Sequence, residues 1–234
     1  MGLGGMTLSV SAGLGSTATG AVESPALVTN TTSLDFDGTS DYLQDTTGGM
    51  DNYARENPFS ISAWIRPDGV SGNQTIACWG KTTSSRWFGL AGNNPNVSCY
   101  EGGGYGAPVG RKGDDVNLSA DTWYHLCVTY NGNGSDSDFK LYINGTEEGS
   151  YVADVAQSAN TFSNVEIGRI GRSSGTNPFD GNIDEVAFWK SELSADEVQQ
   201  IYDNGTGGTH LDLTVNSVKY TSSSNLHGWI RCGD

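Results

Sequence analysis

The sequence has few basic residues and no long apolar run. Lysine and arginine together number 12 against 27 aspartates and glutamates, so the formal net charge is -15. Because contacts to phosphates need a basic footprint, this charge excludes nucleic acid as a partner and argues against anionic membranes. No stretch approaches the roughly 20 apolar residues of a membrane span, so no membrane insertion is expected. The N-terminus lacks a basic segment with a continuous apolar core, so no classical secretion signal is expected.

Cysteine is also scarce. The four cysteines are Cys78, Cys99, Cys127 and Cys232, and they form neither a CxxC pair nor a Cys/His cluster with zinc spacing. Cys78 and Cys127 fall in strand patterns and are expected to be small core residues. The spacing does not define the connectivity of any disulfide.

Turn-forming residues are abundant, with 33 glycines among 234 residues. Short alternating segments between turn signals predict an all-β protein, a two-sheet antiparallel jelly-roll sandwich. The predicted strands are 33–38, 59–66, 75–81, 87–91, 97–101, 122–130, 139–143, 149–153, 162–170 and 182–190. Asn144-Gly145 between two of them is the clearest hairpin turn.

One short C-terminal helix is predicted over 194–204. Ser194 is a good N-cap, and Glu197 three residues later completes a capping box. Apolar residues then follow at helical spacing, and Gly205 is expected to provide a left-handed exit. The preceding strand, 182–190, is apolar enough to be buried on both faces.

Composition divides the chain into three parts. Residues 1–32 form a Gly/Ser/Thr-rich arm that cannot make a core alone. This arm is either a disordered tail or a segment that orders on a partner or a neighbouring subunit. Residues 33–205 form the folded domain, and 206–234 form a polar tail. The alternating piece 210–220 in that tail could add a strand to a sheet or exchange with a partner.

Six segments occur in an order that resembles a laminin-G-like domain. They are SLDFDGTSDYL, FSISAWIRP, TWYHLCVTYNG, KLYINGTEEG, VEIGRIG and FDGNIDEVAFWKSELSADEVQQIYDNG. Over 33–205 the chain is similar to the concanavalin A-like lectin/glucanase superfamily. The resemblance implies two antiparallel sheets, and members that bind sugars or proteins, often with calcium. A glycine-rich leader and the segment LHGWIRCGD are similar to virion-associated proteins of tailed bacteriophages.

Catalysis is not expected. Glycosidases of this fold use two carboxylates on one strand, and the pattern E-x-D-x-x-E that the resemblance implies is absent. Asp184 and Glu185 are adjacent, so regular alternation would direct them to opposite faces of the strand. The G-x-S-x-G match at 171–175 is followed by loop residues rather than a helix, which excludes a nucleophile elbow.

Two clusters of aspartates could hold calcium, which prefers oxygen ligands. One is in LDFDGTSDY and the other in FDGNIDEV. The resemblance implies that the first and last strands are neighbours, so Asp37, Asp41 and Asp184 are the best candidates for a structural Ca²⁺ site. The alternative is that these aspartates cap turns and solvate loops.

Aromatic residues are the candidates for sugar recognition: Trp64, Trp79, Trp87, Tyr100, Tyr105 and Trp123. Most strand tryptophans of a sandwich lie in its core. Tyr100 and Tyr105 instead flank glycines in a loop, where a core role is less expected, so they are predicted to form the contact surface.

These observations predict a non-catalytic virion structural or decoration protein. Its arm would hold the particle or another surface protein, and its lectin-like jelly roll would serve assembly or adhesion to host glycans. We expect a homo-oligomer at the virion surface. The alternative is the carbohydrate-binding module of a secreted, extracellular bacterial protein, while a glucanase-type glycosidase is disfavoured.

Overall fold

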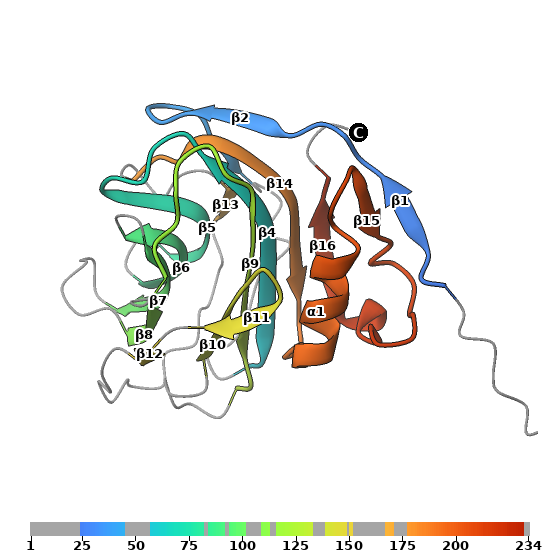
Figure 1. Ribbon diagram of the computed structural model, residues 1–234. Helices are drawn as coiled ribbons and strands as arrows, with labels where there is room; N and C mark the ends of the chain where they lie inside the picture. Colours follow the sequence, from blue (N-terminus) through green and yellow to red (C-terminus); the bar gives the residue numbers. More distant parts are fainter. Residues whose placement is uncertain are drawn as a thin grey trace, which may run out of the picture.

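The computed structural model describes residues 24–44, 57–81, 84–91, 94–101, 109–112, 116–132, 139–148, 150–151, 167–170 and 177–231. Within these ranges the chain forms two stacked antiparallel sheets, with one α-helix and a small two-stranded sheet beside them (Figure 1). This confirms the all-β jelly-roll sandwich with a short C-terminal helix. Among the described residues, no helix has the length and apolar character that a membrane crossing requires.

The first sheet carries the elements that later form the candidate site. Its strand order is β11-β10-β9-β4-β14-β16, and β2 also pairs with β14. The strands are β2 (Leu34–Asp37), β4 (Phe59–Pro67), β9 (Tyr124–Tyr130), β10 (Phe139–Ile143), β11 (Thr146–Glu148), β14 (Asp180–Trp189) and β16 (Leu226–Ile230). The turn between β10 and β11 confirms the predicted hairpin, with Asn144 and Gly145 both at positive φ (51° and 79°).

The second sheet has the order β12-β8-β7-β6-β5-β13-β3 within the described ranges. Its strands are β3 (Leu43–Gln44), β5 (Asn73–Lys81), β6 (Ser84–Ala91), β7 (Asn94–Glu101), β8 (Val109–Lys112), β12 (Ser150–Tyr151) and β13 (Ile167–Ile170). Antiparallel pairing of neighbouring strands links β5, β6, β7 and β8 in sequence order.

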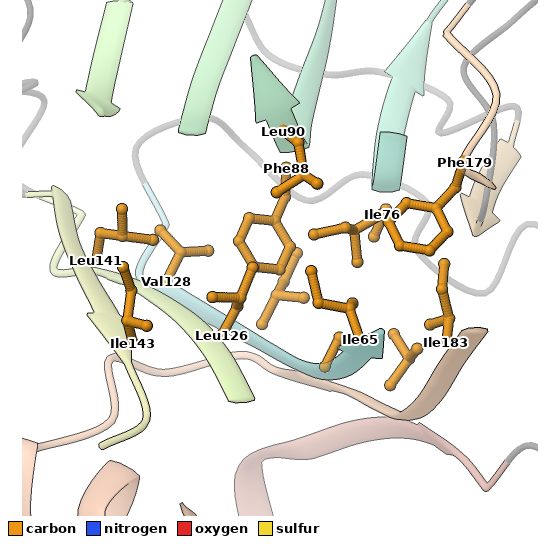
Figure 2. Packing of buried hydrophobic residues seen from close by; sticks show 14 of the residues in the cluster. Ile65, Ile76, Phe88, Leu90, Leu126, Val128, Leu141, Ile143, Phe179 and Ile183 are labelled. Atoms are coloured by element: carbon orange, nitrogen blue, oxygen red, sulfur yellow. The ribbon is translucent and has the colours of Figure 1, made fainter. Parts of the chain in front are cut away.

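The space between the sheets holds the main hydrophobic core. Alternate residues of β4, Ile61, Ala63 and Ile65, are at most 1% exposed and belong to this core. Ile76 and Phe88 contribute from the second sheet, as Figure 2 shows. The alternation seen in the sequence therefore identifies the face of β4 that meets the other sheet.

A second core lies on the outer face of the first sheet. Here the helix α1 (Ala195–Asp203) and the following segment pack on β9, β10 and β14. Trp189 donates a hydrogen bond from Nε1 to Tyr220 Oη at 2.8 Å, and that hydroxyl donates to the carbonyl of Leu213 at 2.9 Å. We call α1 and the segment after it the cover of this face. Because of the cover, β14 is buried on both faces, as its apolar composition predicted.

The helix begins as the sequence predicted and ends differently. Ser194 and Glu197 form the expected capping box, and Asn204 is the C-cap. Gly205 is not left-handed; Gly207 and Gly208 take that conformation instead, at φ 80° and 81°. A Cβ at Gly205 would lie 2.5 Å from Cζ2 of Trp64, so this position needs glycine for close approach and not for its backbone angle.

Both ends of the described chain join the fold. β1 (Leu27–Thr29), which falls in the segment assigned to the arm, pairs with β15 (Thr209–Leu211). Residues 212–220 continue as turns and coil, and a 3₁₀-helix, η2 (Ser223–Asn225), precedes β16. β16 then extends the first sheet beside β14, so LHGWI is a paired strand. Residues 1–23 of the predicted arm lie outside the described residues.

We expect Gly205→Ala to destabilise the protein by about 1–3 kcal/mol, because the added methyl group meets the rigid Trp64 indole. Gly228→Ala is the matched control, since a Cβ there meets nothing within 4 Å. Urea denaturation of both variants measures the difference. Equal stability of the two variants would contradict the close approach.

Candidate ligand-binding pocket

A pocket of about 410 Å³ opens where β4, the end of α1, β15 and the segment after β1 meet. Three aromatic side chains line it: Trp64, Trp123 and Tyr202. Its other lining residues are mostly polar or glycine: Asn30, Thr31, Thr32, Ser33, Asn144, Asp184, Gly205, Thr206, Gly207, Gly208 and His210. An aromatic wall with a few convergent polar groups is typical of a small-molecule site.

Trp64 is the centre of the aromatic wall. Its ring stacks on Tyr202, with centroids 5.8 Å apart and planes 21° apart, and His210 meets it edge-on at 6.2 Å. Gly205 leaves the space that the indole occupies. Trp64 is 8% exposed, whereas Trp123 is 41% exposed and offers its surface to solvent. The pocket thus combines a buried tryptophan, Trp64, with an accessible one, Trp123.

The carboxylates of Asp184 and Glu185 lie on the same side of β14. The register of β14 against β4 shifts between Asp184 and Ala187, and Glu185 has φ 50°. Such a bulge interrupts the alternation of side chains. The prediction that the two carboxylates face opposite sides is therefore wrong, because it assumed a regular strand. Nevertheless, Asp184 lines the pocket and Glu185 does not, whereas a two-carboxylate glycosidase needs both groups at the scissile bond.

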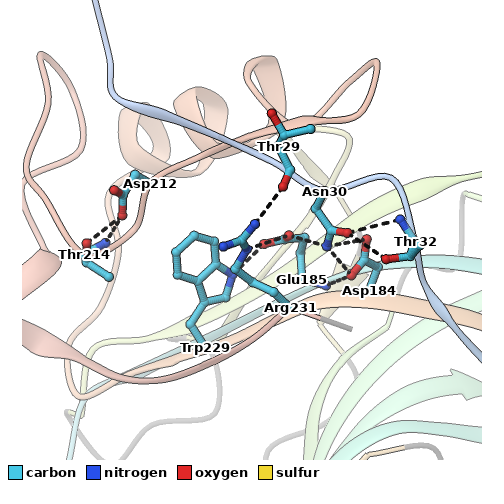
Figure 3. Close-up of polar contacts among 9 residues, drawn as sticks. All are labelled: Thr29, Asn30, Thr32, Asp184, Glu185, Asp212, Thr214, Trp229 and Arg231. Atoms are coloured by element: carbon cyan, nitrogen blue, oxygen red, sulfur yellow. Dashed lines mark hydrogen bonds and ion pairs between the residues drawn. The ribbon is translucent and has the colours of Figure 1, made fainter. Parts of the chain in front are cut away.

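Asn30 joins the two carboxylates. Its Nδ2 donates to Asp184 at 3.0 and 3.2 Å and to Glu185 Oε1 at 2.8 Å (Figure 3). Its Oδ1 accepts from the backbone N–H of Thr32 at 3.1 Å, which fixes the orientation of the amide. Asn30, Asp184 and Glu185 are 3%, 6% and 5% exposed, so these bonds form in a desolvated environment where they stabilise strongly.

Two further side chains hold Glu185 from β16 and the residue after it. Trp229 donates from Nε1 to Glu185 Oε2 at 2.5 Å, and Arg231 Nε lies 3.8 Å from Glu185 Oε1. Arg231 also donates to the carbonyl of Thr29 at 2.8 Å and lies over the Trp229 ring, as Figure 3 shows. The N-terminal and C-terminal segments therefore meet at the β14 bulge.

Two buried histidines lie near the pocket. His210 lines it from β15, and burial lowers the pKa of its imidazole; Glu185 opposes this change and Arg231 adds to it. His125 lies beneath Trp64, with ring centroids 5.4 Å apart, and has no hydrogen-bond partner for either ring nitrogen among the described residues. Burial lowers the pKa of His125 to about 3, with His210 as a second cause. Both imidazoles are therefore neutral at pH 7.

Asp37 and Asp41 lie together in a turn, away from the pocket. The Asp37 carboxylate accepts from the N–H groups of Ser40, Asp41 and Thr39 at 2.7–3.0 Å, and these bonds lower its pKa. Asp37 therefore caps a turn, which is the alternative to calcium binding stated in the sequence analysis.

Asp184 does not join that pair. β2 and β14 are neighbours as expected, but the register places Asp37 opposite Asp180. Asp184 therefore lies about 13 Å further along β14, at 3.3 Å per residue. Calcium at Asp37 and Asp41 stays a prediction, without Asp184 as a shared ligand.

The predicted contact residues Tyr100 and Tyr105 lie largely outside the description. Tyr100 is placed only by its backbone in β7, and Tyr105 is outside the described residues. Their role stays a prediction. Sequence reasoning missed Asn30, Tyr202 and His210, because no local pattern relates Asn30 to a carboxylate 154 residues away.

Comparison with known families agrees with this architecture. The profile of the concanavalin A-like lectin/glucanases superfamily matches residues 37–199, more than half of the sequence. The chain belongs to this superfamily. No curated protein matches its sequence.

Several solved structures share the fold. A heptameric SAP-like pentraxin from Limulus polyphemus is 12% identical with TM-score 0.55, over 84% of this chain and 89% of that one. Domain 4 of an extracellular arabinanase from Geobacillus stearothermophilus, solved with arabinotriose, is 20% identical with TM-score 0.52, over 78% and 89%. Tailspike protein 2 of Escherichia coli bacteriophage CAB120 is 14% identical with TM-score 0.53, over 89% of this chain and 28% of the tailspike. At these identities the likeness concerns the fold.

We expect Asn30→Ala to destabilise the protein by about 1–3 kcal/mol, because Asp184 and Glu185 lose a shared donor while they stay buried. Thr31→Ala, an exposed change next to it, is the control. Chemical denaturation provides the measurement. A loss no larger than that of the control would contradict the bridging role of Asn30.

We expect stability to decrease as pH falls from 6.5 toward 3. The pKa of His125 is depressed to about 3 in the folded protein, so only the unfolded chain binds this proton in that range. The loss of folding free energy from His125 reaches about 2 kcal/mol at pH 5. Denaturation at pH 7 and pH 5, compared between wild type and His125→Leu, measures it. An NMR titration of His125 with a midpoint near 6.5 would contradict the expectation.

Proposed function

We propose that the pocket beside Trp64 is a glycan-binding site and that the chain is a non-catalytic recognition module. The observation that carries this proposal is the accessible Trp123 beside the stacked pair Trp64 and Tyr202, with Asn144 and Asp184 in the same pocket. Aromatic rings offer a large apolar surface to the C–H face of a sugar, and a few polar groups fix its orientation.

The polar groups have capacity for sugar hydroxyls. Asn144 uses its Oδ1 to accept from the His125 N–H at 2.9 Å, while its Nδ2 has no partner among the described residues. That amide can donate to a hydroxyl. Asp184 is an acceptor in the same pocket. Together these residues supply a donor and an acceptor beside an aromatic face.

The charge of the pocket indicates the class of glycan. Asp184 lines it, and the described lining residues include neither lysine nor arginine. The whole chain also carries a net charge of -15. A sialylated or sulfated glycan would be repelled by this potential, so the proposed ligand is a neutral oligosaccharide.

The setting we propose is the surface of a virion. The shared fold with a phage tailspike supports it, as does the glycine-rich segment that precedes β1. In this proposal residues 1–23 hold the particle or another surface protein in a homo-oligomer, and the jelly roll faces outward. The alternative is a secreted carbohydrate-binding module, supported by the fold shared with the arabinanase domain solved with arabinotriose.

We expect Trp123→Ala to weaken binding to a neutral glycan by on the order of tenfold or more, which corresponds to the loss of about 1.4 kcal/mol of stacking. Because Trp123 is 41% exposed, its removal should leave the melting temperature nearly unchanged. A glycan array identifies the ligand, and calorimetry with that ligand measures the affinity.

Tyr42→Ala is the control, since Tyr42 is 44% exposed and does not line the pocket. Tyr100→Ala and Tyr105→Ala test the contact surface predicted from the sequence. If those variants lose binding while Trp123→Ala binds fully, the glycan binds at the tyrosines and not in this pocket. Retention of sialylated glycans alone would overturn the assignment of a neutral ligand.

A further inference from the structure

Asp184, Glu185 and His210 form a buried cluster of potential metal ligands. One carboxylate oxygen from each acid and one imidazole nitrogen lie within 4.8 Å of one another. The three residues are 6%, 5% and 8% exposed. The two acids come from the bulge of β14 and the histidine from β15, so the fold brings together groups that are distant in sequence.

The histidine points to a ligand independently of the acids. Its imidazole has no hydrogen-bond partner among the described residues, although it is more than nine-tenths buried. A neutral imidazole nitrogen that makes no hydrogen bond within the protein can bind a metal ion. A cavity of about 10 Å³ borders both Glu185 and His210, next to the larger pocket. This is about the space that one water molecule or ion needs.

The charge balance of the cluster favours a cation. Arg231 Nε lies 3.8 Å from Glu185, and the neutral Asn30 amide binds both acids. Burying a carboxylate costs several kcal/mol unless a cation compensates it. The oxygens keep acceptor capacity, since each carboxylate offers about four lone-pair sites.

We propose that Asp184, Glu185 and His210 bind a divalent transition-metal cation of the zinc type. A donor set of one nitrogen and two oxygens selects this class, because imidazole suits zinc and its neighbours in the series. Calcium instead takes six to eight oxygen ligands, and an imidazole does not contribute to that set. This site differs from the calcium site predicted at Asp37 and Asp41. It shares Asp184 and His210 with the proposed glycan pocket, but the argument for it does not rest on glycan binding.

The three ligand atoms must move slightly closer together to coordinate one ion. Two ligands of one tetrahedral zinc ion, each bonded at about 2.1 Å, lie roughly 3.4 Å apart. The three atoms within 4.8 Å must therefore approach by roughly 1.4 Å at most. Asn30 holds the acids from the segment after β1, and its amide orientation is fixed by Thr32, so it supports the ligands without being one. The bound ion would link β14 to β15.

The test is calorimetric titration of the full chain with Zn²⁺ after EDTA treatment and dialysis, under reducing conditions. We expect one equivalent to bind to the wild type. His210→Gln should weaken binding roughly 100-fold or more, because loss of a direct ligand costs at least as much as loss of an outer-shell partner. His227→Gln on β16 is the control and should bind like the wild type.

Co²⁺ then reports the donor atoms. Ligand-field bands without a thiolate charge-transfer band are expected from nitrogen and oxygen ligands. The proposal is overturned if Zn²⁺ does not bind, if His210→Gln binds it as the wild type does, or if the Co²⁺ spectrum shows thiolate ligation. Should His210→Gln fail to fold, Asp184→Asn provides the second variant with the same expected loss. A rise in melting temperature with Zn²⁺ in the wild type alone would support the proposal.

Discussion

The amide of Asn30 between two buried carboxylates is the interaction on which the site depends. It satisfies Asp184 and Glu185 together and ties the segment after β1 to the bulge of β14. Arg231 and Trp229 approach Glu185 from the C-terminal end. Without these donors, two neighbouring carboxylates would be buried with their desolvation uncompensated. The pocket and the cluster with His210 both begin at this point of the fold.

The second constraint is the cover on the outer face of the first sheet. α1 and the residues after it bury Trp189 and Tyr142, so this sheet is packed on both sides. Tyr202 and the loop at Gly205 come from the same cover and press against Trp64. The cover therefore supplies both stability and one wall of the pocket. Function resides in such surface features, while the sandwich beneath them is a common scaffold.

Local patterns predicted the elements that local physics determines. The capping box at Ser194 and Glu197 specified where α1 begins, and Asn144-Gly145 specified the hairpin. The bulge in β14 could not be predicted in this way, since nothing in the residues around Glu185 requires an irregular pairing. Gly205 likewise suggested a left-handed end of the helix. In the structure it instead leaves space for the indole of Trp64, a residue 141 positions earlier in the chain.

The sequence by itself determined the class of fold, the superfamily, the acidic charge and the start of helix α1, because periodicity, capping and composition act over short distances. Only the tertiary structure decided which polar residues meet. Asn30, Asp184 and His210 come from three segments whose proximity depends on strand register. Register also separated Asp184 from Asp37, although β2 and β14 are neighbours. The residues of this site come from distant parts of the chain, so the alignment of the strands decides which of them meet. That alignment cannot be predicted from short stretches of sequence.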